Sequence, residues 1–258
     1  MNAGAMHGIM DGEIFAVYKD RQSASEGSPL AEVTTSAIMP YFTNMAGSSG
    51  DGELRSGVAT KIRAGKTPDL SLHISTEKGQ KKQLECVAQA FEAIRTDKSS
   101  QLRIVVVDQE VAELIISAER GQIVATVKDP FLEAYGVTRM YHQIEPTVPH
   151  ALDFLRAAAH YHRHLRRFHG LDANGLLDKI TIQFTKLETK SLEQGLGPTE
   201  PLTNLIKGGV VELTVDTNSI YGIKVINNSE IPLYASIFFF ESSDFAISTS
   251  FVSQIACL

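Results

Sequence analysis

Short runs of β-branched and aromatic residues recur along this chain, and turn residues separate them. Early examples are GEIFAVY (12–18), LAEVTTSAIM (30–39) and PDLSLHI (68–74), with a Gly/Ser-rich loop at 46–53 among them. Apolar or alternating runs of about four to eight residues between turn signals predict β-strands. The number of such runs argues against a mainly helical fold and predicts a β-rich protein.

Only two segments carry a long helical pattern. In the first, residues 77–96, one face holds Leu84, Val87, Ala88, Phe91 and Ile94. The second lies between Pro149 and Gly170, and its apolar stripe consists of Ala151, Phe154, Ala158, Tyr161, Leu165 and Phe168. Spacings of three and four residues place such side chains on one face of an α-helix. We therefore predict an α+β fold with two main amphipathic helices, at 77–96 and 149–169.

The strand runs suggest two regions. Residues 1–75 are expected to form a small, barrel-like β unit. Residues 76–258 are expected to form an α+β region that holds both helices and ends in a β-sandwich-like unit. Within it, the runs at 102–108, 111–119 and 122–129 are close together, which favours a meander of sequential antiparallel strands.

Composition excludes several classes of protein. The formal net charge of −6 argues against a chain-wide nucleic-acid surface, and no apolar run is long enough for a membrane span. The two cysteines, Cys86 and Cys257, do not form a disulfide framework. We therefore expect a cytoplasmic protein that binds neither nucleic acid nor membrane, and no cofactor motif is present. KGGV (207–210), for example, lacks the strand–glycine–helix order of a phosphate loop.

The second helical segment, AAAHYHRHLRRFHG (157–170), holds the residues that look most like a functional site. His160 and His164 are four residues apart, the spacing at which two imidazoles on one helix can share a zinc ion. Position 161 is Tyr, so the glutamate of a helical H-E-x-x-H motif is missing, and the sequence names no third ligand. A metal site at His160 and His164 therefore stays a minor alternative.

The favoured interpretation of the same segment is a solvated basic face. Arg156, Arg163 and Arg167 point away from the apolar stripe on a helical wheel, and the two histidines lie on its flank. The predicted interaction surface contains Arg156, His160, Arg163, His164 and Arg167, and we expect it to meet an acidic surface of a partner protein. A second possible site is the carboxylate pair Asp108 and Glu110 at a strand end, although such acids more often cap turns.

Four segments together resemble a known family. They are 3–33 (AGAMHGIMDGEIFAVYKDRQSASEGSPLAEV), 60–74 (TKIRAGKTPDLSLHI), the helix with HLRR (164–167), and 221–247 (YGIKVINNSEIPLYASIFFFESSDFAI). In order and spacing they are similar to the region that follows the catalytic domain in caspase-type cysteine peptidases of mushroom-forming fungi. The resemblance implies an accessory region beside a peptidase domain. It also implies that the family's β structure continues past SQIACL, so that this chain corresponds to a part of a longer relative.

The residues that would make such a protein a peptidase are missing. The family's activity needs a histidine in a His-Gly motif after a strand and a cysteine in an Asp-x-Cys-His-Ser-Gly motif. Neither His7 nor His169 follows such a strand, and neither Cys86 nor Cys257 stands in the cysteine motif. We therefore expect no catalytic residue here, and Cys86 is expected to be an inert thiol on an apolar helix face.

The favoured function is a non-catalytic accessory module that binds a protein partner or a caspase-like catalytic domain. Two alternatives stay open. One is a ligand-binding β module, for instance for carbohydrate, near Tyr221 or Tyr234; the absence of Trp weighs against it. The other is a hydrolase with an unrecognised site.

Overall fold

The computed structural model describes residues 1–4, 9–39, 42–47, 56–63, 65–75, 81–97, 100–166, 177–191, 195–214, 216–230 and 236–251. The chain forms two compact units. The first comprises Met1–Leu171 together with Phe238–Ser248, and the second comprises Asp172–Ile237 together with Thr249–Leu258.

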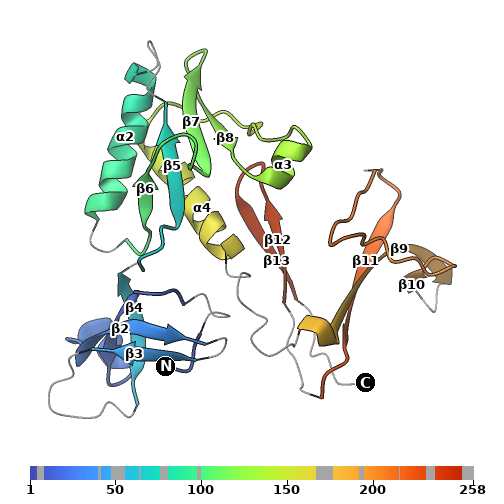
Figure 1. Cartoon of the computed structure of the whole chain (residues 1–258), viewed down its shortest axis with the longest axis horizontal. Coiled ribbons are helices and arrows are strands. Elements are labelled where there is room, and N and C mark those ends of the chain that lie inside the picture. The colour runs from blue at the N-terminus through green and yellow to red at the C-terminus, as the bar shows by residue number, and fades with distance from the viewer. Residues whose placement is uncertain are drawn as a thin grey trace. The chain divides into compact units, whose positions relative to one another are not determined.

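The first unit begins with an open antiparallel sheet (Figure 1). Its strands are β1 (Ile14–Tyr18), β2 (Ala31–Ile38), β3 (Thr43–Ala46) and β4 (Val58–Arg63), in the order β3-β2-β1-β4. A short helix, α1 (Arg21–Glu26), connects β1 to β2. Phe15 and Val33 are directly paired across β1 and β2, and they form a small apolar cluster with Ala31. The sheet does not close, so the barrel-like arrangement expected for residues 1–75 is wrong, whereas the strands themselves are confirmed.

A second sheet follows in the same unit, with the order β6-β5-β7-β8. Its strands are β5 (Leu70–Ile74), β6 (Ile104–Val106), β7 (Leu114–Glu119) and β8 (Gln122–Val127). β5 pairs in parallel with both β6 and β7, and β7 pairs antiparallel with β8. The β7–β8 hairpin turns at Arg120 and Gly121, which both have positive φ, as a type I′ turn requires.

The expected meander is therefore wrong for β6, which pairs with β5 and not with β7. The register explains how a short loop can connect β6 to β7 on opposite sides of β5. Val106 at the end of β6 and Leu114 at the start of β7 both pair with Leu72, so the loop only has to cross β5 at that level. Because β5 lies at the centre of this sheet, it belongs structurally with the segment after residue 75, although the sequence had grouped it with the strands before.

Two long helices pack beside this sheet, α2 (Lys81–Thr96) and α4 (Val148–Leu165) (Figure 1). They contact each other, and both contact β5. The core between helices and strands includes Leu70, Leu72, Leu114 and Leu155, which are completely buried. Both predicted helices are confirmed where the structure describes them. Leu155 was missing from the predicted stripe of α4, and Phe168 lies outside the described residues.

The edge of this sheet beyond β8 is covered by the chain that follows it. A short helix, α3 (Pro130–Ala134), comes directly after β8 and is capped by the Asp129 carboxylate. The next segment then pairs with β8 through the bridges Thr126–Arg139 and Ile123–Ile144.

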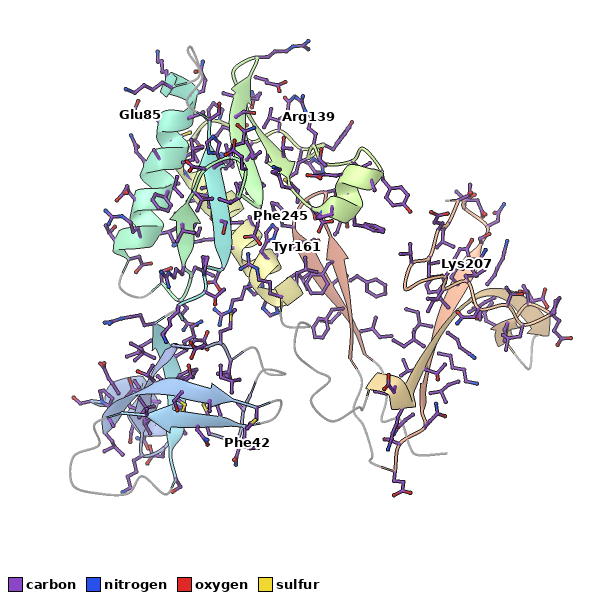
Figure 2. The ribbon with its side chains drawn as sticks, in the orientation of Figure 1. Phe42, Glu85, Arg139, Tyr161, Lys207 and Phe245 are labelled. Carbon is purple, nitrogen blue, oxygen red and sulfur yellow. The ribbon has the colours of Figure 1, made fainter. Side chains whose placement is uncertain are left out.

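A hairpin from the end of the chain completes the first unit. It is formed by β12 (Ser236–Glu241) and β13 (Ala246–Phe251). Phe245, in the turn between the strands, is 3% exposed, and its ring lies 5.2 Å from that of Tyr161 on α4 (Figure 2). Phe154 also contacts Phe245. The hairpin tip thus extends the apolar core along α4 at Phe154 and Tyr161.

The second unit holds a three-stranded sheet in the order β10-β9-β11. Its strands are β9 (Ile180–Ser191), β10 (Gly195–Pro198) and β11 (Ile220–Asn227), and a 3₁₀ turn, η3 (Leu177–Lys179), precedes them. Among the described residues of 177–237, the buried side chains are Thr185, Asn227 and Ser229, and none is apolar. The apolar core among the described residues therefore lies in the first unit.

The α+β, β-rich fold class is confirmed. The strands outnumber the helices, they form several separate sheets, and the two main helices are those expected. No helix in the described part of the chain is both long and apolar enough to cross a membrane.

Leu155 provides a test of this core. Leu155→Ala is expected to lower the free energy of unfolding by about 2–5 kcal/mol, because it leaves a cavity under α4. Urea unfolding followed by far-UV circular dichroism measures the change. Leu30→Ala is the matched control: Leu30 is 57% exposed, so its loss should change stability by no more than about 0.5 kcal/mol. Equal losses for the two variants would contradict the core described here.

Candidate functional site

The predicted interaction surface lies on the C-terminal half of α4. His160 is exposed and His164 is partly buried, and their ring centroids are 4.2 Å apart. The i, i+4 spacing therefore does bring the two imidazoles together, as expected. They line an open depression of about 570 Å³ with Arg156, Arg163 and the segment Gln101–Leu102.

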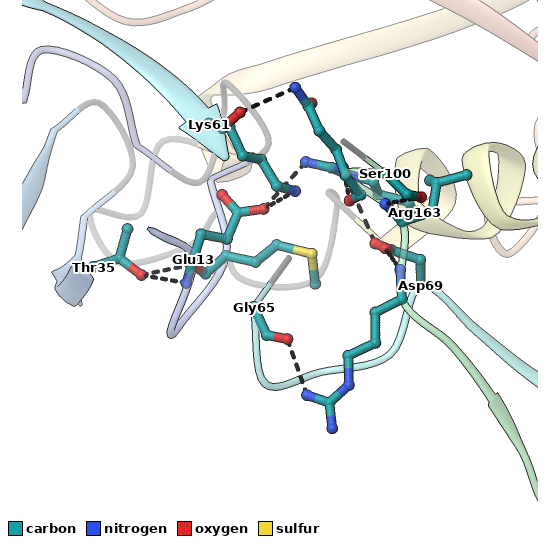
Figure 3. Close-up of polar contacts among 11 residues, drawn as sticks. Glu13, Thr35, Lys61, Gly65, Asp69, Ser100 and Arg163 are labelled. Atoms are coloured by element: carbon teal, nitrogen blue, oxygen red, sulfur yellow. Dashed lines mark hydrogen bonds and ion pairs between the residues drawn. The ribbon is translucent and has the colours of Figure 1, made fainter. Parts of the chain in front are cut away.

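Arg163 does not belong to a solvated face. Its side chain is only 11% exposed, and its Nη2 atom donates to Glu13 Oε1 at 3.1 Å (Figure 3). The Lys61 Nζ atom donates to the same oxygen at 2.5 Å, and Asp69 Oδ1 lies 3.8 Å from Arg163 Nε. We call Glu13, Lys61, Asp69 and Arg163 the four-charge cluster. Its members come from the segment before β1, from β4, from the segment before β5, and from α4.

The expected basic face is accordingly smaller than predicted. Arg163 is neutralised inside the protein because two buried carboxylates require a cation, and the helical wheel alone shows no such partner. Arg156 is half-exposed and lies 4.0 Å from Asp97, so part of its charge is also balanced. Arg167 lies outside the described residues. The part of the surface that remains accessible consists of His160, His164 and the outer side of Arg156.

Burial dominates the electrostatics of the four-charge cluster. It lowers the pKa of the Lys61 ammonium, and the hydrogen bond with Glu13 opposes this only in part. It likewise raises the pKa of the Asp69 carboxyl, although the backbone N–H of Arg103 donates to Asp69 Oδ2 at 2.7 Å. Two buried atoms of the cluster, Glu13 Oε2 and Arg163 Nε, have no hydrogen-bond partner. For Lys61 and Asp69, burial thus carries a desolvation cost that the nearby opposite charges do not fully offset.

The metal alternative gains no support from the geometry. Within the ranges that the structure describes, no three His, Cys, Asp or Glu side chains come close enough together to hold an ion. Among these described residues, the His160–His164 pair therefore finds no third ligand for a zinc ion.

The thiol chemistry of the peptidase family also has no counterpart among the described residues. Cys86 is a free, buried thiol on α2, and its Sγ atom donates to the Gln83 carbonyl oxygen at 3.0 Å. Burial raises the pKa of this thiol, which disfavours the nucleophilic thiolate. His7, His169 and Cys257 lie outside the described residues.

The carboxylate pair proposed at a strand end is not assembled into a site. Asp108 lines an open depression with His73, whose Nδ1 atom is 3.0 Å from the Val107 carbonyl oxygen. Glu110 is exposed and does not line this depression. Tyr221, considered for a carbohydrate site, stacks on Phe184 in an open sheet, and Tyr234 lies outside the described residues.

Sequence reasoning missed two features. The first is His162, which was given no role but is 7% exposed and has no hydrogen-bond partner at Nε2. Its ring lies 5.8 Å from that of Phe245 at the hairpin tip. Burial lowers the pKa of His162, and the nearby Glu113 carboxylate opposes this only in part. The sequence does carry one signal for its burial: His162 directly follows Tyr161, which belongs to the predicted apolar stripe of α4.

The second feature is an apolar face on the sheet of the second unit. The register places Ile182 opposite Val225 and Phe184 opposite Ile223, so these side chains project from the same face. The apolar residues on this face, which we call the β9–β11 apolar face, are Ile180, Ile182, Phe184, Tyr221, Ile223 and Val225. Asn227, opposite Ile180, and Lys186, opposite Tyr221, lie on the same face. Ile182 is 52% exposed and Ile223 is 38% exposed. The opposite face carries polar residues at its centre, among them Gln183 and Lys224.

Comparisons with known proteins add no assignment. No family model matches the chain, and neither a curated protein nor a solved structure matches it.

His162 gives the site a testable pH dependence. Its pKa in the folded protein lies below the ordinary value of 6.5, so the unfolded chain takes up a proton first as the pH falls. The stability that His162 contributes is therefore present above about pH 6.5 and is lost progressively below it. In a His162→Leu variant, the slope of unfolding free energy against pH between 7 and 5 should become shallower, as urea titrations at several pH values would measure. An unchanged slope in His162→Leu would show that His162 is not the titrating group.

Proposed function

We propose that this chain is a non-catalytic, cytoplasmic protein-interaction module that works beside a caspase-type cysteine peptidase. The observation that carries the proposal is the β9–β11 apolar face. Six apolar side chains line this face, and Ile182 and Ile223 on it remain substantially exposed. Exposed apolar patches of this kind are typical of surfaces that bind proteins.

The described part of the second unit buries no apolar side chain, and this supports the same proposal. A sheet of a few strands is stable in water when one face packs against other groups. Its described residues bury no apolar side chain, so a partner that covers Ile182 and Ile223 would supply the missing burial. Each side chain of this size contributes about 1.5–3 kcal/mol when it is fully transferred out of water.

The link to peptidases rests on the sequence resemblance, and the chemistry of the chain supports an accessory role. Cys86 is buried on a helix, and its raised pKa disfavours a thiolate nucleophile. A reduced, unpaired cysteine also fits a cytoplasmic location. The partner is therefore proposed to be the catalytic domain of a caspase-type peptidase, with the β9–β11 apolar face as the contact.

Binding to such a catalytic domain tests the proposal directly. The purified chain is immobilised, and its affinity for the catalytic domain of a mushroom caspase-type peptidase is measured by biolayer interferometry. Replacing both Ile182 and Ile223 with Ser should weaken binding by at least about tenfold, which corresponds to 1.4 kcal/mol.

The control is the double variant Gln183→Ser and Lys224→Ser, which changes the opposite face of the same strands. It should bind within about twofold of the parent, since rim and remote positions contribute little. Absence of binding by the parent chain, or equal loss in the two double variants, would refute the proposed contact.

A further inference from the structure

The first unit contains two apolar cores that do not merge. One lies in the β3-β2-β1-β4 sheet and is built around Phe15, Ala31 and Val33. The other lies between α2, α4 and the β6-β5-β7-β8 sheet. Among the described residues, no side chain of 1–63 contributes to the second core and none after residue 63 contributes to the first. Apolar packing therefore does not set how the first sheet is oriented on the rest of the unit.

Polar contacts occupy the place between the two cores. Glu13 and Lys61 belong to the first sheet and its lead-in, whereas Asp69 and Arg163 belong to the second part, and all four meet in the four-charge cluster (Figure 3). The Gln101 side chain adds a hydrogen bond from Nε2 to the Lys61 carbonyl oxygen at 3.1 Å. The Arg103 guanidinium donates to the Gly65 carbonyl oxygen at 3.0 Å.

The charges of the cluster balance, but their burial is costly. Two cations face two anions, and the side chains of Glu13 and Asp69 are 1% and 3% exposed. The pKa of Lys61 is lowered and that of Asp69 is raised, which shows that burial disfavours the charged form of each. Buried ion pairs of this kind contribute little net stability, yet their distances and directions are specific.

We propose that the four-charge cluster is an orientation lock. It fixes the angle of the β3-β2-β1-β4 sheet relative to the part formed by α2, α4 and the β6-β5-β7-β8 sheet, and this angle becomes variable when the balance of charges is broken. The pivot is the short segment 65–68, directly before Asp69 and the start of β5 at Leu70. Both cores stay intact during this movement because they share no side chain. The lock is a device of the first unit and does not depend on the partner proposed above.

Distance measurements between spin labels test the lock. Labels are attached to Glu32→Cys on β2 and Gln89→Cys on α2, two exposed positions, in a chain with Cys86 and Cys257 changed to Ser. Double electron–electron resonance should give one narrow distance distribution at neutral pH. Glu13→Gln should abolish that single narrow distance, because Lys61 and Arg163 then share only Asp69. Glu92→Gln is the control: it breaks an exposed ion pair with Arg95 on α2, away from the cluster, and should leave the distribution unchanged.

A second variant separates orientation from stability. The combination Glu13→Gln, Lys61→Met, Asp69→Asn and Arg163→Met removes all four charges and leaves no unpaired buried ion. It should retain the circular dichroism of the parent and slow hydrogen exchange in β5 and β7, while the label distance becomes broad. A narrow distribution in this variant would overturn the proposal, because something other than the charges would then set the angle. Loss of exchange protection throughout the first unit, in this variant or in Glu13→Gln, would also overturn it, since the two cores would then be one cooperative structure.

Discussion

The placement of Arg163 between two buried carboxylates is the interaction on which the arrangement of the first unit depends. A guanidinium buried beside Glu13 and Asp69 joins α4 to the segments before β1 and β5. The same contact withdraws a positive charge from the surface of α4. A helix that seemed in sequence to present a basic face therefore turns one of its arginines, Arg163, inward. Of the described residues expected on that face, Arg156 and His160 are exposed and His164 is partly buried.

The two units differ in how far they bury their apolar side chains. The first fills its interior with leucine, isoleucine and valine from the second sheet and with the inner faces of α2 and α4, and it adds Phe245 from a distant hairpin. In the second, apolar side chains such as Ile182 and Ile223 remain exposed on a face of the sheet. The first unit thus builds an apolar interior, whereas the described part of the second leaves apolar side chains exposed.

The local structure was predictable because its signals are local. Alternating apolar residues predicted β1, β2 and β5, and the three-and-four spacing predicted α2 and α4. Strand pairing was not predictable, because β6 pairs with β5, from which α2 separates it in the sequence, and not with β7, the next strand in the chain. The inward turn of Arg163 was missed for the same reason: Glu13 is 150 residues away in the sequence. The alternation of Ile180, Ile182 and Phe184 was visible in β9, but whether anything covers these side chains depends on the whole fold.

A double-mutant cycle on Glu13 and Arg163 tests the central claim most directly. Unfolding free energies are measured by urea titration for the parent, Glu13→Gln, Arg163→Met and the double variant. The account predicts that the two single changes are not additive. The sum of their effects on the unfolding free energy should differ from the effect of the double variant by about 0.5–3 kcal/mol, as is typical of residues in contact. Additivity within about 0.3–0.5 kcal/mol would contradict it, because that result is typical of residues that do not touch.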